Sequence, residues 1–267
     1  MRGLVDSHCH LDAAEFDLDR DAVVAAAHRA GVSALVLPAV QRGNFDAVLE
    51  LCRRHACCFP AFGIHPMAVE QAVPEDLAAL QQRLAEGEAV AVGEIGLDFF
   101  VEGADRVRQE YFFVEQLKLA RAFDLPVLLH IRRAQDEVLK QLRRFKVRGG
   151  IAHAFNGSHQ QAAAFIDLGF KLGFGGAMTW PRALRIRELA ATLPLESIVL
   201  ETDAPDIPPS WLGRTGRNSP DQLPEIAQVL AELRGQTLAQ IVDATRQNVL
   251  SVLPKMHQLC TSSQVSL

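Results

Sequence analysis

The chain has 267 residues, of which 49% are hydrophobic and 22% charged, a balance typical of a folded globular protein and not of a disordered one. Its 32 acidic residues outnumber its 27 basic residues, and the net charge of −5 argues against broad electrostatic attraction to nucleic acid or to an anionic membrane. An anionic substrate is not excluded, because a bound divalent cation reverses the sign of the charge locally.

The sequence contains neither an apolar run of about 18 residues, as a transmembrane helix needs, nor a basic segment followed by an apolar core, as in a signal peptide. The five cysteines are Cys9, Cys52, Cys57, Cys58 and Cys260. Their number is odd and their spacing fits neither a thiolate metal site nor a redox motif. We therefore expect reduced thiols in a cytoplasmic protein that has no membrane partner and is a monomer or a weak oligomer.

Short apolar runs alternate with helical patterns from one end of the chain to the other. The expected strands are Leu4–Ser7, Ala34–Ala39, Cys58–Gly63, Ala89–Gly93, Pro126–Leu129, Gly150–Ala152, Phe170–Gly173 and Ile198–Leu200. The expected helices are Arg20–Ala30, Asn44–Arg54, Glu75–Ala85, Arg106–Phe123, Ala134–Phe145, His159–Leu168, Arg182–Thr192, Pro224–Arg234 and Leu238–Leu253. The strands lack strict alternation of apolar and polar residues, as parallel strands buried on both faces do.

Eight strand–helix repeats predict an α/β fold, the (β/α)8 TIM barrel, as a single domain over residues 1–254. Residues 255–267 are polar and weakly patterned, so we expect a loosely ordered tail there. In such a barrel the carboxyl ends of all strands meet at one rim, where active sites lie.

Imidazole and carboxylate side chains stand at the ends of several of these strands. His8 and His10 follow the first strand and, being two residues apart, face the same side, where both rings can bind one divalent ion. The pair alone is an unspecific signal. Asp6 lies on the same face, deeper in the strand, and we expect it to support an imidazole.

Glu94 follows the fourth strand, and a buried glutamate is rare unless it is paired or coordinated. Its two oxygens suit it to bridge two metals, whereas the alternative is a surface carboxylate in a loop. Asp98 is a candidate partner for an inward histidine or for a substrate group. His130 and His153 end the fifth and sixth strands. A single such histidine is usually structural, but two on neighbouring strands favour metal ligands.

Asp203 ends the eighth strand, where a carboxylate can bind metal and accept a proton from water; the alternative is a turn residue before Pro205. Glu201 faces the same side and is expected to support the site from below. His65 follows the third strand and is a candidate substrate contact. Arg132 is a candidate phosphate ligand, although a solvated loop fits it equally well. The sequence contains no phosphate-binding P-loop and no Gly-x-Ser-x-Gly motif, which favours metal-activated water.

Several segments together resemble the TatD family of metal-dependent deoxyribonucleases, whose barrel is related to that of the amidohydrolases. They are Asp6-Ser7-His8-Cys9-His10-Leu11-Asp12, Gly63-Ile64-His65-Pro66, Gly93-Glu94-Ile95-Gly96-Leu97-Asp98, His130-Ile131-Arg132, His153-Ala154-Phe155 and Glu201-Thr202-Asp203-Ala204-Pro205. The resemblance implies two divalent ions, of zinc, magnesium or manganese. It places His8, His10 and Asp203 on one ion and His130 and His153 on the other, with Glu94 as the bridge.

We therefore expect a hydrolase that cleaves DNA phosphodiester bonds, preferentially in single strands or at ends, with Asp203 and Glu94 as the catalytic groups. His65 and Arg132 would contact the substrate, and Asp6, Asp98 and Glu201 would support the ligands. One alternative keeps the site but hydrolyses an ester or amide, such as aminoacyl-tRNA or a small cyclic amide. The other, a non-enzymatic scaffold, conflicts with the complete set of candidate ligands.

Overall fold

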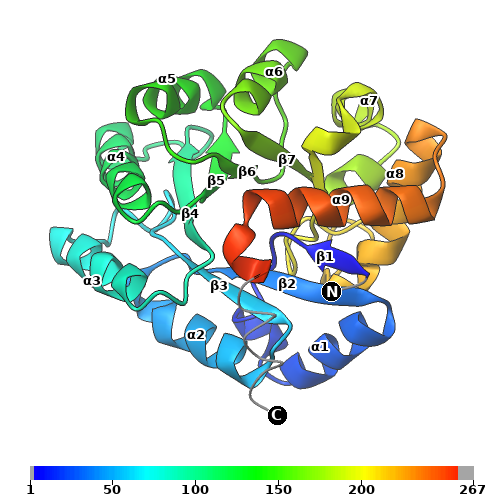
Figure 1. Cartoon of the computed structure of the whole chain (residues 1–267), viewed down its shortest axis with the longest axis horizontal. Coiled ribbons are helices and arrows are strands. Elements are labelled where there is room, and N and C mark those ends of the chain that lie inside the picture. The colour runs from blue at the N-terminus through cyan, green and yellow to red at the C-terminus, as the bar shows by residue number, and fades with distance from the viewer. Residues whose placement is uncertain (1–2, 258–267) are drawn as a thin grey trace.

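The computed structural model describes residues 3–257, and its eight strands form one parallel sheet in sequential order. The strands are β1 (Leu4–Asp6), β2 (Val32–Pro38), β3 (Cys58–Phe62), β4 (Ala91–Asp98), β5 (Val127–Arg132), β6 (Gly150–Ala152), β7 (Phe170–Phe174) and β8 (Ile198–Leu200). Just beyond β1, Ser7 donates its N–H to the carbonyl of Leu200 at 3.0 Å, which brings the last strand beside the first. The sheet therefore curls into the expected (β/α)8 barrel (Figure 1).

Helices surround the barrel and lie within two residues of the expected bounds. They are α1 (Arg20–Arg29), α2 (Phe45–Arg54), α3 (Pro74–Ala85), α4 (Arg106–Ala122), α5 (Gln135–Phe145), α6 (His159–Asp167), α7 (Leu184–Thr192), α8 (Leu223–Arg234) and α9 (Leu238–Val252). Ser158 and Thr237 start α6 and α9 by accepting backbone N–H groups with their hydroxyls. Among the described residues, no helix has both the length and the apolar character needed to cross a membrane.

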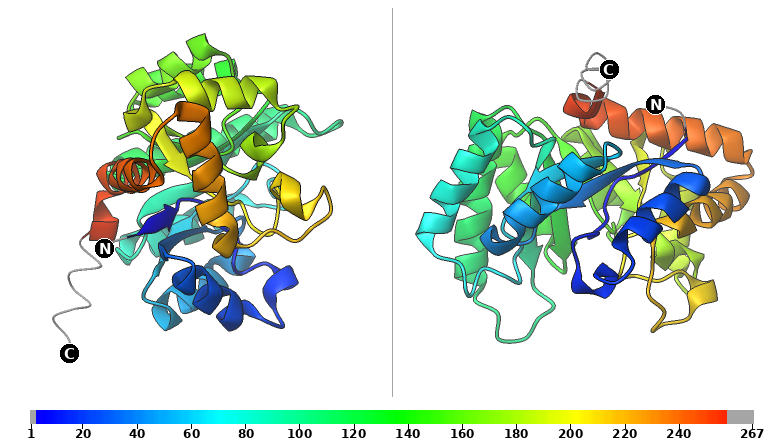
Figure 2. Two further views of the ribbon diagram at one scale, coloured as in Figure 1. Left: turned by 90° about the vertical axis from the view of Figure 1, so that its right-hand side faces the viewer. Right: turned by 90° about the horizontal axis from the view of Figure 1, so that it is seen from below.

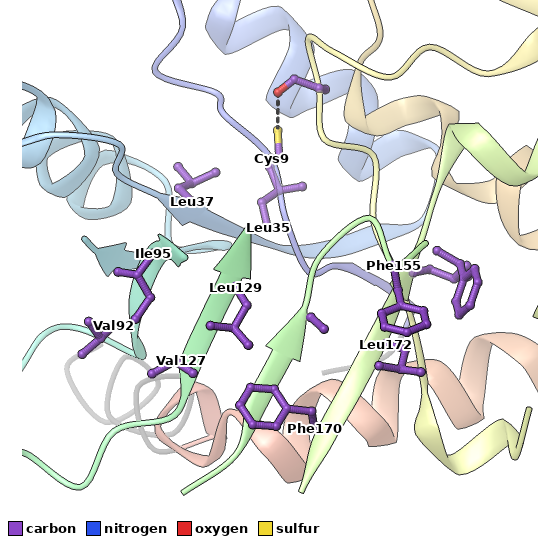
Figure 3. Packing of buried hydrophobic residues seen from close by; sticks show 14 of the residues in the cluster. Cys9, Leu35, Leu37, Val92, Ile95, Val127, Leu129, Phe155, Phe170 and Leu172 are labelled. Carbon is purple, nitrogen blue, oxygen red and sulfur yellow. Dashed lines mark hydrogen bonds between the residues drawn. The ribbon is translucent and has the colours of Figure 1, made fainter. Parts of the chain in front are cut away.

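Alternate residues of the strands pack into two separate apolar layers. Leu35, Leu129 and Leu172 belong to the layer between the strands and the surrounding helices (Figure 3). Val36 and Leu128, at alternate positions, belong to a second cluster inside the barrel. This alternation follows from the two-residue period of a strand, and it makes the strands apolar on both faces.

Helix α9 closes one end of the barrel, because its Val252 and the following Leu253 belong to the inner cluster. It crosses the barrel on one side, whereas the loops that follow the strands project on the opposite side (Figure 2). Residues 254–257 form another helical turn and Met256 is fully buried, so the tail is ordered there, contrary to the expectation. The remainder of the predicted tail, including Cys260, lies outside the described residues.

Strand β4 departs from the expected segment, because it continues past Gly93 to Asp98. Val92 pairs with Val127 and Ile95 with Leu129, so β4 contains one residue more than β5 between these pairs. Such a β-bulge redirects a side chain. Gly96 permits the close approach of the two strands, since a Cβ there would lie 1.9 Å from the carbonyl oxygen of His130. The bulge gives Glu94 its position within a strand, and not in a surface loop.

Candidate metal centre

The inward positions of neighbouring strands change from apolar to polar toward the open rim. Leu128 is followed two residues later by His130, and Ile151 by His153, so each imidazole occupies an inward position. Val199 lies on β8, and Glu201 and Asp203 follow at the same spacing just beyond the end of that strand. The barrel therefore places an apolar core at the α9 end and imidazoles and carboxylates at the other end.

Glu94 lies at the centre of the polar cluster, with a side chain only 2% exposed. Its Oε2 is 3.1 Å from Nε2 of His8 and 3.4 Å from Nε2 of His10. Its Oε1 is 3.1 Å from Nδ1 of His130 and 3.4 Å from Nε2 of His65. Burial alone would raise the pKa of Glu94, but the surrounding imidazoles hold it well below its usual range. The two oxygens of one ionised carboxylate thus face two different pairs of histidines.

Asp203 joins the pair formed by His8 and His10 from the opposite side. Its Oδ1 lies 3.5 Å from Nε2 of His10, 3.8 Å from Nε2 of His8 and 3.4 Å from Nε2 of His153. Burial opposes ionisation, but His153 and the other imidazoles lower the pKa of Asp203. The rings of His153 and His8 are stacked, with centroids 3.7 Å apart. His153 therefore lies beside His8 and Asp203, whereas the expectation from the sequence pairs it with His130.

Two more carboxylates contact the outer nitrogens of the strand-end histidines. Asp98 Oδ2 is 3.0 Å from Nε2 of His130. Glu201 Oε1 is 3.0 Å from Nδ1 of His153, within ion-pair distance although without hydrogen-bond geometry, and it also accepts the N–H of Ala154. The hydrogen bond to Asp98 places a ring proton of His130 on Nε2 and leaves Nδ1 as a lone-pair donor, and the charge of Glu201 favours a proton on the Nδ1 side of His153.

Asp6 supports the site differently from the sequence-based expectation. Its carboxylate does not contact an imidazole: it accepts the backbone N–H groups of His8 at 3.2 Å and Thr202 at 3.0 Å, and the Thr202 hydroxyl at 2.6 Å. Burial raises the pKa of Asp6 to about 7, against the effect of these hydrogen bonds. Asp6 therefore joins the backbone of the segment after β1 to that of the segment after β8.

His65 has the opposite arrangement of its ring proton. Its Nδ1 accepts the backbone N–H of Met67 at 3.1 Å, and burial lowers its pKa, so the neutral ring carries its proton on Nε2. That N–H points toward Glu94. Arg132 is exposed at the end of β5, with its guanidinium 3.6 Å from the centre of the Phe100 ring.

The sequence reasoning missed the polar residues that hold these groups from behind. Gln116, on α4, binds both backbone groups of Ile64, and Gln109 on the same helix accepts the N–H of Asp98 at 2.9 Å. Both glutamines are buried, and they lie seven residues apart, hence on one side of the helix. In the sequence, two glutamines on an otherwise apolar face of this helix are the feature that could have indicated these supporting residues.

The cluster fits divalent cations by the chemistry and convergence of its donors. Three groups have ligand atoms within 4.8 Å of one another: His8 with His10 and Asp203, His8 with Glu94 and His153, and His65 with Glu94 and His130. Nε2 of His8 and Nε2 of His10 are only 3.2 Å apart, and without metal Glu94 outweighs the effect of burial and raises the pKa of His10 to about 9. Nitrogen lone pairs that converge so closely repel unless a cation or proton lies between them. Mixed imidazole and carboxylate ligands suit zinc, manganese or iron.

The cluster opens into a cavity of about 770 Å³ that the post-strand loops surround. Its lining includes His10, His65, Glu94, His130, Arg132, His153, Asp203 and Asp206. Both candidate substrate contacts thus border the same space, together with all the candidate ligands except the fully buried His8. A volume of this size is typical of a small-molecule or substrate site.

The barrel, the convergent donors and the adjoining cavity are those of a metal-dependent hydrolase. The sequence model described as "TatD related DNase" matches residues 5–254, and the chain therefore belongs to the TatD family. It is 42% identical over 252 residues to the uncharacterized metal-dependent hydrolase YjjV of Escherichia coli K12, covering 93% of this chain and 96% of that protein. The crystal structure of YjjV superposes with a TM-score of 0.90, covering 94% of this chain and 98% of that one.

A second relative has a name that states an activity. The "3'-5' ssDNA/RNA exonuclease TatD" of Shigella flexneri is 33% identical over 254 residues, covering 92% of this chain and 97% of that protein. The predicted family and fold are thus confirmed over nearly the whole chain.

Proposed function

We propose that this hydrolase is a deoxyribonuclease that cleaves phosphodiester bonds in DNA with two divalent cations. The observation that carries the proposal is the carboxylate of Glu94, whose Oε2 faces His8 and His10 while its Oε1 faces His130. Paired cations held about 4 Å apart are the usual arrangement for displacement at phosphorus. The activity named for the Shigella relative supports the same class of substrate.

The contacts of the histidine rings support one assignment of the ligands. His8, His10 and Asp203 would hold one cation. His130 and His153 would hold the other, because Asp98 and Glu201 lie beside their outer nitrogens, and Nδ1 of His130 and Nε2 of His153 face the carboxylates of Glu94 and Asp203.

We leave His65 out of the ligand set by the same reasoning. Its Nε2 carries the proton, since Nδ1 accepts the N–H of Met67. An N–H group directed into the cavity suits a phosphate oxygen, so we assign His65 to substrate binding. In the absence of substrate, Nε2 of His65 lies 3.4 Å from Oε1 of Glu94.

The remaining groups act on the phosphodiester and on the attacking water. When bound, the cations lower the pKa of water and offset the negative charge of the phosphate. Asp203 is ionised and 14% exposed, so its carboxylate can orient the attacking water and accept its proton. His65 and Arg132 donate N–H groups to the phosphate oxygens. The cavity is enclosed by the loops at the rim, and the chain has a net charge of −5. Both features favour single strands or ends over a long duplex.

The test combines metal content with activity. Elemental analysis of the purified protein should find two divalent ions per chain, and the protein should cleave single-stranded DNA more readily than duplex. Glu94→Gln and Asp203→Asn should each lose activity by about 100-fold or more while their circular dichroism stays unchanged. Near-normal cleavage by either variant, with metal controlled, would overturn the mechanism. Hydrolysis of aminoacyl-tRNA without any cleavage of DNA would overturn the substrate.

A further inference from the structure

A second hollow of about 720 Å³ adjoins the metal cavity. We call it the Trp180 groove, and it lies between the segment from Ala177 to Ile186 and the loop from Ile207 to Arg214. Ala177, Ile186 and Ile207 line both the groove and the metal cavity. A polymer in the cavity therefore has a continuous path into the groove.

The charge of the groove is opposite to that of the chain as a whole. Its lining contains two exposed arginines, Arg182 and Arg214, and within the described residues no acidic side chain lines it. The neighbouring cavity, in contrast, contains Asp12, Glu15 and Asp206 in addition to the metal cluster. In a protein of net charge −5, two unopposed guanidinium groups beside the site point to an anionic ligand.

Trp180 gives the groove a surface suited to a planar ring. Its Nε1 donates to the carbonyl of Pro208 at 3.0 Å, which fixes the indole while the residue stays half-buried. The guanidinium of Arg214 lies 5.5 Å from the ring centre. An aromatic ring with an adjacent arginine is a common stacking site for the bases of single strands. Because stacking needs unpaired bases, this chemistry favours a single strand over a duplex.

We propose that the Trp180 groove binds the nucleotide next to the scissile phosphate of single-stranded DNA. Its base stacks on Trp180, and Arg182 and Arg214 hold its phosphate. This assignment rests on the proposed nuclease function and adds to it the site that holds the strand beside the metals.

Kinetics on two substrates tests the groove. On a short oligothymidylate, Trp180→Ala should raise KM about 10-fold, Trp180→Phe should keep most of the affinity, and Arg214→Ala should weaken binding. None of these variants should change turnover of methyl p-nitrophenyl phosphate, a diester too small to reach the groove. Trp211→Phe is the matched control, because Trp211 is exposed and is not part of the groove lining. A wild-type KM for the oligonucleotide in folded Trp180→Ala would overturn the proposal.

Fluorescence separates the groove from the nuclease function. The chain has two tryptophans, so in Trp211→Phe the emission comes from Trp180 alone. A phosphorothioate oligothymidylate, which resists cleavage, should quench this emission, and Arg214→Ala should weaken the quenching. Quenching in a protein that does not cleave DNA would support the groove while rejecting the nuclease. Cleavage of DNA without quenching would reject the groove alone, and the absence of both would reject both.

Discussion

Gln116 holds the backbone of Ile64 through both ends of its side-chain amide. Its Oε1 accepts the N–H of Ile64 at 2.6 Å, and its Nε2 donates to the carbonyl of Ile64 at 3.0 Å. Gln116 is fully buried on α4, and Ile64 directly precedes His65. The helix thus sets the position of a side chain that we assign to substrate binding.

Gln116→Leu should lower kcat on DNA about 10-fold, because the released Ile64 backbone lets His65 move. The free energy of unfolding should fall by about 1–3 kcal/mol, since two buried backbone groups lose their partner. Gln141→Leu is the matched control: Gln141 is equally buried, on α5, and contacts Glu110 instead. Steady-state kinetics and chemical denaturation measure both effects. If Gln116 acts through His65, adding Gln116→Leu to His65→Ala should cause little further loss of kcat, and full multiplication of the two losses would contradict this role.

In the proposed two-ion site, His153→Ala should lose one ion, whereas His65→Ala should keep both. The reason is that Glu201 favours a proton on the Nδ1 side of His153, whereas Nδ1 of His65 accepts the N–H of Met67 and leaves the proton on Nε2. Elemental analysis after dialysis measures the ion content, and circular dichroism checks that both variants are folded. Both should have reduced kcat. The opposite pattern of metal loss would show that His65 is the ligand.

Metal uptake should release protons, and affinity should rise with pH. In the metal-free site Glu94 opposes the effect of burial and raises the pKa of His10 to about 9, so near neutral pH a cation must displace a proton from this ring. Because the pKa of His10 is higher in the folded protein than the unfolded value of 6.5, protonation of His10 stabilises the metal-free fold. This contribution is fully present below pH 6.5 and is lost as the pH rises through about 9. Calorimetric titration of chelator-treated protein in buffers of different ionisation enthalpy measures the released protons. A metal affinity that does not change between about pH 7 and 9 would contradict the prediction.

Gly173→Ala should destabilise the protein by about 1–3 kcal/mol, because the new methyl group competes for space with Glu201. A Cβ at Gly173 would lie 2.2 Å from Oε2 of Glu201, a carboxylate that is 1% exposed. Displacing Glu201 should also weaken metal binding through His153. Gly43→Ala provides the control, since its nearest neighbour would be 3.8 Å away. Urea denaturation compares the two, and equal stabilities would show that Glu201 moves without cost.

The sequence was sufficient for the barrel and for the set of polar residues at its rim. Strand order and the common direction of parallel strands bring His8, His130, His153 and Asp203 to one end, whatever the details of packing. The extension of β4 was not predictable in this way, because the bulge at Glu94 depends on how closely Gly96 approaches β5. A period-two pattern contains no information on such an approach.

The roles of individual rings also depend on contacts that no local pattern reveals. Whether His65 or His153 offers a lone pair depends on Met67 and Glu201, and the position of His65 depends on a glutamine 52 residues from Ile64. Asp6 illustrates the same point. Its place in the strand predicted support for the site, but its partner is the His8 backbone and not the His8 ring.

The position of α9 has a practical consequence for handling this protein. The helix closes the barrel at the end opposite to the post-strand loops (Figure 2). Met256, one residue before the end of the described chain, packs in the same inner cluster as Val252. A surface tether or a fusion partner attached beyond His257 would therefore leave the mouth of the cavity facing the solution. Immobilised in this orientation, the protein can be exchanged between metals, buffers and oligonucleotides on a single sensor surface.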